Sequence, residues 1–340
     1  MRWLPALFFH GSNAKQFEHW YPFYRWTLTQ EGDAPACLQE HEDAVELLGP
    51  EHSMTCKNLI NCIYNNTKEI DKADMSSALV LLGLTPAVIG QIGPTIHNKA
   101  QLCYQNPILG FLCVLGAPAI AFGMPWAKTD PREPTGGNTF VSGERWFFNW
   151  MFCRPTQTPT QQDKTQKPSI WLRSLKYSIH LLKYLLAAGA AVNVFLNAWS
   201  LGDQTIVSWK CTSSYLELIW VGTTLGPIFF AVVGYSMEES ECTWSKSTPW
   251  GLGARFSYSL SNIGGAVHVL FGTLTFSSVL FIGTLDALGV VGRLTASALV
   301  CQFITALELE RVEDEREEER ANKRKKSEVT VAEGMTCGSC

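Results

Sequence analysis

The feature that most constrains the fold of this chain is a set of six long stretches with almost no charge. They cover residues 75–98, 101–127, 184–202, 218–237, 256–285 and 287–307, and Arg293 is the only charged residue in them. A helix that crosses a bilayer needs about 20 mostly apolar residues. The pattern therefore predicts an all-α fold, a polytopic membrane helix bundle with about six transmembrane helices.

The segments around these stretches divide the 340-residue chain further. We expect an N-terminal extramembrane region (1–74), transmembrane helices one and two (75–126), a loop (127–175), helices three and four (176–237), a second loop (238–261), helices five and six (262–307), and a charged helix with a Cys-containing tail (308–340). The first loop is rich in Pro, Thr and Gln, which favours partial disorder. Pro86 and Pro118 leave a second interpretation open, in which the first two stretches form one re-entrant hairpin.

Charge and motif content exclude several functions. The net charge of −4 shows no basic bias, so nucleic acid is not an expected partner. The sequence contains no HExxH, GxSxG, P-loop or dinucleotide-binding glycine pattern. We therefore predict a non-enzymatic protein whose first partner is the lipid bilayer, and no cofactor apart from the copper considered below.

The Lys and Arg residues bear on orientation, because positively charged loops tend to stay in the cytosol. With six spans, one side receives six of them before the first stretch, eight at residues 128–176, two in the second loop and seven in the tail. This distribution favours an integral membrane protein with both termini in the cytoplasm.

One pattern favours the opposite side for the N-terminal region. Asn65 opens a glycosylation sequon at residues 65–67, just before the first apolar stretch. Cys37, Cys56 and Cys62 lie nearby and could form a disulfide if this region is luminal. A luminal N-terminal region would need an odd number of spans to keep the basic tail in the cytosol.

Several segments resemble a group of uncharacterised fungal multi-pass integral membrane proteins. The resemblance rests on residues 67–86, 184–194, 211–220 and 271–310, and it extends over roughly residues 55–310. The group has no assigned activity. The resemblance therefore implies a multi-pass membrane fold and implies nothing about chemistry.

Asp286 and Arg293 are the charged residues most clearly at membrane depth, and intramembrane charge is by default a functional hypothesis. The simpler interpretation places Asp286 in a tight turn between spans five and six, with Arg293 reaching the same interface. We favour the simpler interpretation, because the turn must fall near here for both helices to reach about 20 residues.

Asn193 and Asn197 lie four residues apart in the third span and so share a helix face. They either line a polar path or form hydrogen bonds between helices, and the second interpretation is favoured. Gly222 and Gly226 form a GxxxG pattern, which serves helix packing first and self-association second.

The segment that follows the last span is highly charged, with acidic and basic residues at helical spacings. It predicts a helix that leaves the membrane and meets a protein partner. The charged and polar residues discussed above do not form a known catalytic or binding motif. The leading hypothesis is therefore a sensor, scaffold or assembly component, and a small-solute transporter or channel is the alternative.

The last residues read GMTCGSC and resemble the start of a heavy-metal-associated domain. In that family two thiolates at a CxxC motif hold Cu(I), a soft ion suited to Cys ligands. The resemblance implies Cys337 and Cys340 as ligands and a membrane metal-handling protein as a second alternative. The helix and strands of such a domain do not follow, so we favour coincidence or a truncated gene model.

Overall fold

The computed structural model describes residues 20–22, 24–25, 36–37, 39–41, 43–44, 53–120, 170–209, 215–243 and 250–336. The chain divides into two compact units, residues 1–122 with 183–340, and residues 123–182. Within the second unit only residues 170–182, the beginning of one helix, are described. Most of the predicted Pro/Thr/Gln-rich loop, as well as Cys337 and Cys340, lies outside the described residues.

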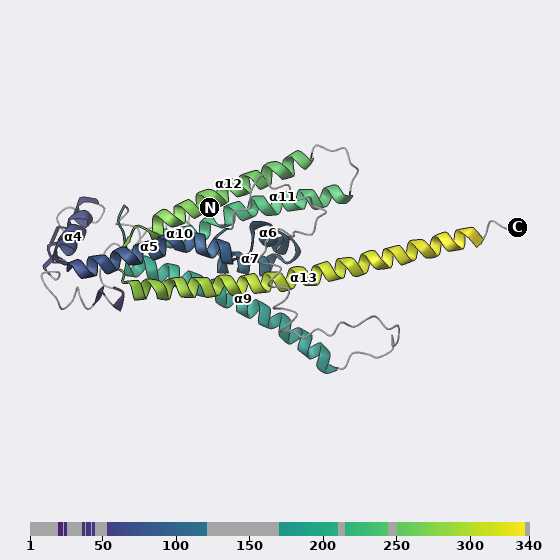
Figure 1. Ribbon diagram of the computed structural model, residues 1–340, viewed down its shortest axis with the longest axis horizontal. Helices are drawn as coiled ribbons and strands as arrows, with labels where there is room; N and C mark the ends of the chain where they lie inside the picture. Colours follow the sequence, from purple (N-terminus) through teal and green to yellow (C-terminus); the bar gives the residue numbers. More distant parts are fainter. Residues whose placement is uncertain are drawn as a thin grey trace. The chain divides into compact units, whose positions relative to one another are not determined.

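The described part is almost entirely helical (Figure 1). Its elements are α4 (Ser53–Asn66), α5 (Glu69–Ile92), α6 (Ile96–Gln105), α7 (Pro107–Gly116), α9 (Ile170–Gln204), β1 (Ile206–Val207), α10 (Leu216–Thr223), α11 (Leu225–Thr243), α12 (Trp250–Phe276), β2 (Val279–Leu280) and α13 (Thr284–Thr336). The two short strands pair antiparallel, Ile206 with Leu280 and Val207 with Val279. The prediction of an all-α fold is therefore confirmed.

Four helical segments of the described part are long and apolar enough to cross a membrane. They are Glu69–Ile92, Ser178–Gln204, Leu216–Glu238 and Thr284–Glu317. Helix α12 is long enough but less apolar, and it still exposes an apolar stripe that includes Leu252, Phe256, Ile263, Val267, Leu270 and Leu274. Large apolar side chains exposed along helices of this length are suited to lipid, so the chain is an integral membrane protein.

The second apolar stretch does not form one long helix. Residues 96–105 and 107–116 form two ten-residue helices, α6 and α7, which fold back on each other at Asn106. A Cβ atom at Gly110 would lie 2.6 Å from the Cys103 Cα, so the two helices touch along their backbones. The break has a local cause: Pro107 lacks an N–H group, and the Asn106 side chain caps α7 by accepting a hydrogen bond from the Leu109 N–H.

Two predicted loops are shorter than the sequence suggested. Helix α9 begins at Ile170, so the end of the predicted loop 127–175 is helical. Helix α11 continues to Thr243 and α12 begins at Trp250, which covers most of the predicted loop 238–261.

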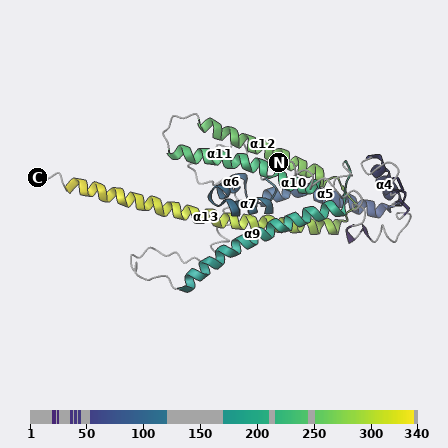
Figure 2. The same ribbon diagram turned by 180° about the vertical axis from the view of Figure 1, so that it is seen from behind.

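The charged segment continues the last span without a break, because α13 runs from Thr284 to Thr336 as one helix (Figure 2).

Contacts between residues fix the direction of the helices within the larger unit. The Thr284 N–H at the start of α13 donates to the Asp74 carboxylate near the start of α5, at 3.1 Å. Farther along, a Cβ at Gly93 would lie 4.0 Å from the Ala298 Cβ. Helices α5 and α13 therefore run parallel, side by side.

Other pairs of helices in this unit run antiparallel. Helix α9 opposes α13, because Lys183 pairs with Glu308 and Asn193 bonds Ser297. Helices α10 and α11 oppose α12, because Thr224 meets His268 and Glu238 meets Tyr258. The core that these helices share consists of small and branched side chains, including Ala78, Leu82, Ala187, Val194, Ala287, Leu294, Ala298 and Cys301.

Candidate functional site

The most concentrated group of polar contacts in the described part surrounds residues 117–119, the turn that follows α7. The Lys99 side chain on α6 reaches this turn, and its ammonium group donates to the carbonyl oxygens of Ala117 at 2.6 Å and Ala119 at 2.8 Å. Lys99 is only 1% exposed. Among the described residues, no carboxylate forms an ion pair with it. In the described part of the chain, the Lys99 ammonium group is thus held by two backbone carbonyl groups.

The carbonyl oxygen of Pro118, between these two, has partners from two other elements. The Thr224 hydroxyl, at the junction of α10 and α11, donates to it at 2.8 Å. His268 on α12 places Nε2 at 2.9 Å from the same oxygen. A carbonyl oxygen only accepts, so Nε2 carries the proton and Nδ1 faces the Thr223 hydroxyl at 3.0 Å.

We name Lys99, Thr224, His268 and the carbonyl groups of residues 117–119 the carbonyl cage. The carbonyl groups of three consecutive residues just beyond the end of α7 are each satisfied by a side chain from another element. Unpaired carbonyl groups in an apolar bundle cost several kcal/mol each by order of magnitude, so the cage makes the break after α7 tolerable. The Lys99 charge also opposes the negative end of the α7 dipole.

Aromatic packing holds the His268 side of the cage. The Trp220 ring on α10 stacks on the His268 ring, with centroids 5.3 Å apart and an interplanar angle of 9°. The Phe276 ring meets Trp220 edge-on at 4.9 Å. Gly272 allows this approach, because any Cβ there would collide with the Trp220 indole nitrogen.

A second polar group lies on the seam between α9 and α13. Lys183 and Glu308 form an ion pair whose side chains are 13% and 5% exposed. Arg311 adds a contact to Glu308 at 3.2 Å, and it approaches Glu315 at 3.9 Å. Beyond this group the described side chains of α13 are mostly exposed, so the ion pair marks the point where the helix leaves the bundle.

The predicted residues Asn193 and Asn197 lie on the same seam. The Asn193 side-chain N–H donates to the Ser297 hydroxyl at 2.8 Å and to the Arg293 carbonyl at 3.0 Å. Asn197 donates back to the Asn193 carbonyl at 2.7 Å. Both amides are thus used in contacts between and within helices.

The predicted charges Asp286 and Arg293 fall on α13. Asp286 is in the first turn of the helix and half-buried, and Arg293 is exposed two turns later. Burial raises the pKa of the Tyr21 phenol, and among the smaller influences Asp286 raises this pKa further while Arg293 lowers it. The structure therefore brings these two residues to the same region, near the start of α13.

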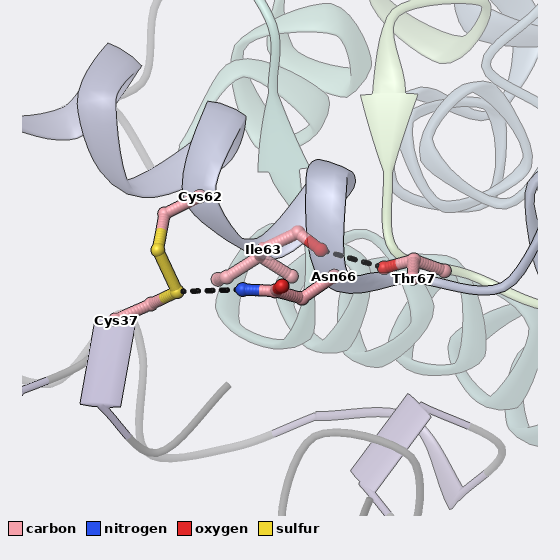
Figure 3. The surroundings of a disulfide bond; sticks show 5 residues. All are labelled: Cys37, Cys62, Ile63, Asn66 and Thr67. Atoms are coloured by element: carbon pink, nitrogen blue, oxygen red, sulfur yellow. Dashed lines mark hydrogen bonds between the residues drawn. A yellow bond between two sulfur atoms is a disulfide. The ribbon is translucent and has the colours of Figure 1, made fainter. Parts of the chain in front are cut away.

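A disulfide closes the region before the first span (Figure 3). Cys37 bonds Cys62 on α4, so two of the three cysteines that the sequence offered are paired. The Asn66 amide donates to the Cys37 sulfur at 3.5 Å, and the Thr67 hydroxyl donates to the Ile63 carbonyl at 2.8 Å. The sequon residue Asn65 is exposed in the last turn of α4.

This disulfide belongs to a small hydrophobic cluster, which we name the cap cluster. Its buried members are Trp20, Tyr24, Cys37, Leu59, Ile63, Met75, Ile206 and Phe281. Phe281 comes from the turn before α13, and its ring meets Trp20 edge-on at 5.5 Å and Tyr24 at 6.0 Å. The cap cluster thus joins the region before α5 to the start of α13.

Phe281 adopts an unusual backbone conformation, with φ at +64°. A bulky residue in the left-handed region is a genuine outlier, and such strain costs about 1–3 kcal/mol. Its backbone N–H points to the Met75 sulfur at 3.4 Å, and its ring is 1% exposed. The packing of the ring therefore compensates for the strain at this joint.

Within the described residues, no group of three or more His, Cys, Asp or Glu side chains could hold a metal ion. The CxxC of Cys337 and Cys340 lies outside them, so the copper hypothesis stays a prediction.

Sequence reasoning missed Lys99 and Phe281. In the sequence, the only signal for Lys99 is its place as a single basic residue between two apolar stretches that contain prolines. Phe281 carried no signal, because its role depends on contacts with distant residues.

A scan against protein-family models found no match, and searches of curated proteins and of solved structures found none either. The resemblance to fungal multi-pass membrane proteins therefore stays a prediction, and function has to be argued from the geometry.

Proposed function

We propose that this chain is a non-enzymatic membrane protein, a sensor or assembly component, in which α13 links a disulfide-closed cap on one side of the membrane to a charged helix on the other. The observation that carries the proposal is the joint at the start of α13. There Phe281 is inserted into the cap cluster, and Thr284 bonds Asp74 through both its N–H and its hydroxyl group. A displacement of the cap would act directly on a helix of 53 residues.

The proposal implies five membrane crossings, by α5, α9, α10 with α11, α12 and α13. Helix α7 has 10 residues and is about 15 Å long, roughly half the thickness of the hydrocarbon core. We therefore treat α6 and α7 as a hairpin within the bundle. It differs from the re-entrant interpretation of the sequence, which joined the first two apolar stretches, because α5 is here a crossing of its own. An odd number of crossings puts the cap and the tail on opposite sides.

This arrangement replaces our expectation that both termini lie in the cytoplasm. Seventeen basic residues would face the cytosol: the seven of the tail, Lys246, Arg255 and the eight at residues 128–176. The cap would then face an oxidising compartment, where disulfides such as Cys37–Cys62 form and persist. The sequon at Asn65 fits the same side, because glycosylation takes place in the secretory pathway.

Glycosylation and tail accessibility test the orientation together. We expect a glycan-dependent mobility shift that Asn65→Gln abolishes, and a C-terminal epitope that protease reaches only from the cytosolic face. If both sites are reached from the same side, the five-crossing arrangement is wrong and the sensor proposal loses its basis.

Hydrogen–deuterium exchange tests whether the cap acts on the tail. Reduction of the disulfide, or Phe281→Ala, should accelerate exchange near the start of α13 and change the proteins labelled by a proximity enzyme fused to the tail. The control is Leu288→Ala, which removes an apolar side chain that is 55% exposed on the same helix. The coupling between cap and tail would be contradicted if the wild type, Phe281→Ala and Leu288→Ala gave the same labelling pattern.

A second function, small-solute transport, is favoured by one observation. The end of α7 and the junction of α10 with α11 are both interrupted, and they meet in the carbonyl cage. Interrupted helices whose free backbone groups face each other often form transport sites in membranes. Against this reading, the cage carbonyls already bind side chains of the chain itself. The test measures solute flux in vesicles that contain the purified protein. If the wild type shows flux, and Lys99→Gln folds normally but shows none, transport would be favoured over the sensor proposal.

A further inference from the structure

Glu217 on α10 is a buried carboxyl group that neither proposed function uses. It is 0% exposed, and neither of its oxygens has a hydrogen-bond partner from another described residue. The flanking residues Leu216, Trp220 and Val221 are buried and apolar or aromatic. An ionised carboxylate in such surroundings is strongly disfavoured unless a cation or several donors approach it.

The surroundings of Glu217 follow from the register between α10 and α12. Thr224 meets His268, and one turn earlier Trp220 lies against Gly272 and Phe276. The same register places Glu217 opposite the last turn of α12, where Thr275 lies. The Trp220 indole N–H and the Thr275 hydroxyl are also buried without a partner among the described residues.

Glu308 provides a contrast inside the same protein. It is also buried, at 3% exposure, but it meets the cations of Lys183 and Arg311. Glu217 and Glu308 are therefore buried to a similar depth, but Glu308 is surrounded by cations and Glu217 by apolar and aromatic side chains.

We propose that Glu217 is a proton-binding site, whose carboxyl group is neutral at pH 7 and holds its proton inside the bundle. A neutral carboxyl group has no charge to desolvate, so it tolerates this position far better than a carboxylate. Loss of the proton would create a buried charge with no cation paired to it among the described residues, and α10 would have to move to bring that charge to water or to a cation. Proton binding thus holds α10 in the observed packing, and the assignment is independent of the sensor proposal.

The titratable groups near this site come from two other parts of the chain. His268 on α12 stacks on Trp220, one helical turn from Glu217. Tyr21, which precedes α4, lies within electrostatic reach of Glu217, and also of Asp286 and Arg293 on α13. Within the described residues, none of these forms an ion pair with Glu217.

Infrared spectroscopy of the purified full-length chain tests the assignment. We expect the carbonyl band of a protonated carboxyl group at pH 7, shifted by exchange into D2O and lost in Glu217→Gln. Glu308→Gln is the matched control and should leave the band unchanged. If Glu217→Gln does not fold, Glu217→Asp should move the band without removing it.

A hydrophobic carbodiimide gives a second readout, since it adds to protonated carboxyl groups in apolar surroundings. The carboxyl proton moves to a carbodiimide nitrogen, the carboxylate oxygen bonds the central carbon, and the adduct rearranges to an acylurea without a leaving group. We expect the adduct on the peptide that contains Glu217. A wild-type spectrum without the band overturns the proposal, as does an adduct at Glu308 in place of Glu217.

Discussion

Two lysines of the bundle, Lys99, which is fully buried, and Lys183, whose side chain is 13% exposed, are stabilised in different ways. Lys99, in the α6–α7 hairpin, is held by the carbonyl oxygens of Ala117 and Ala119, without a carboxylate partner among the described residues. Lys183, on the seam between α9 and α13, is paired with Glu308. One region therefore uses a cation to satisfy an interrupted backbone, and the other uses a pair of opposite charges to join two complete helices.

The difference shows what each charge contributes. In the carbonyl cage the lysine supplies donors that the fold needs, because three carbonyl groups have no helical partner. On the seam the helices satisfy their own backbones, so the ion pair adds direction and specificity more than stability. Removing the lysine of the carbonyl cage and removing the carboxylate of the ion pair should therefore destabilise the protein by different amounts.

The largest expected effect is that of Lys99→Met, which keeps the length of the side chain and removes its donors. Two buried carbonyl groups lose their partner, and each unsatisfied group costs about 1–3 kcal/mol, so we expect a loss of roughly 3–5 kcal/mol. Thermal unfolding in detergent measures it, and Lys57→Met at an exposed position of α4 is the control. An unchanged melting temperature would show that the cage is not needed.

The next effect is that of Glu308→Gln, which leaves Lys183 without its opposite charge. Breaking a buried pair is costly, but Lys183 is 13% exposed and can turn toward water, so we expect a loss of about 2–3 kcal/mol. Glu315→Gln, at an exposed carboxylate of the same helix, should change the melting temperature little. Combined Lys183→Met and Glu308→Leu should restore stability, and failure to do so would contradict our view of the seam.

A third variant, Gly116→Ala, tests how closely the two regions are packed together. A Cβ at this position would lie 2.6 Å from the Cys301 sulfur on α13 and 3.0 Å from the Ala190 Cβ on α9. Overpacking of this kind costs about 1–3 kcal/mol. Gly289→Ala is the control, because a Cβ there has no neighbour within 4 Å. Equal unfolding temperatures for the two variants would show that the α6–α7 hairpin is not tightly packed against α9 and α13.

The smallest effect is expected for Asn193→Leu on the seam. Hydrogen bonds between membrane helices contribute about 1 kcal/mol, so the loss should be of that size. Phe195→Leu, at a side chain that is 51% exposed on α9, serves as the control. A flux phenotype of the Asn193→Ala and Asn197→Ala pair at unchanged stability would instead favour the polar path.

The features that the sequence predicted correctly are local ones. The near-absence of charge over some 20 residues makes α5 and the apolar parts of α9 and α13 suited to a membrane, whatever they pack against. The charged segment after residue 307 continues the last span because neither Pro nor Gly interrupts it before Gly334. Hydropathy also suggested a second span at residues 101–127. There Asn106 and Pro107 divide the stretch, and their capping effect outweighs the apolar composition.

The pairing of distant residues could not be predicted from the chain. Three cysteines before α5 allowed several disulfides, and only the packing of Cys37 against α4 selects Cys62. In the sequence Glu217 is an ordinary polar residue at the start of an apolar stretch. Only the packed structure shows that its carboxyl group is buried and has no hydrogen-bond partner among the other described residues.

The sequence by itself determined that this chain is a helical membrane protein with a long charged helix at its end, because hydropathy and helix continuity depend on neighbours along the chain. Tertiary structure decided the roles of Lys99, Glu308 and Glu217. The state of a buried charge depends on which donors, acceptors or opposite charges other helices bring to it. Lys99 meets carbonyl groups, Glu308 meets two cations, and Glu217 meets no charged partner among the described residues.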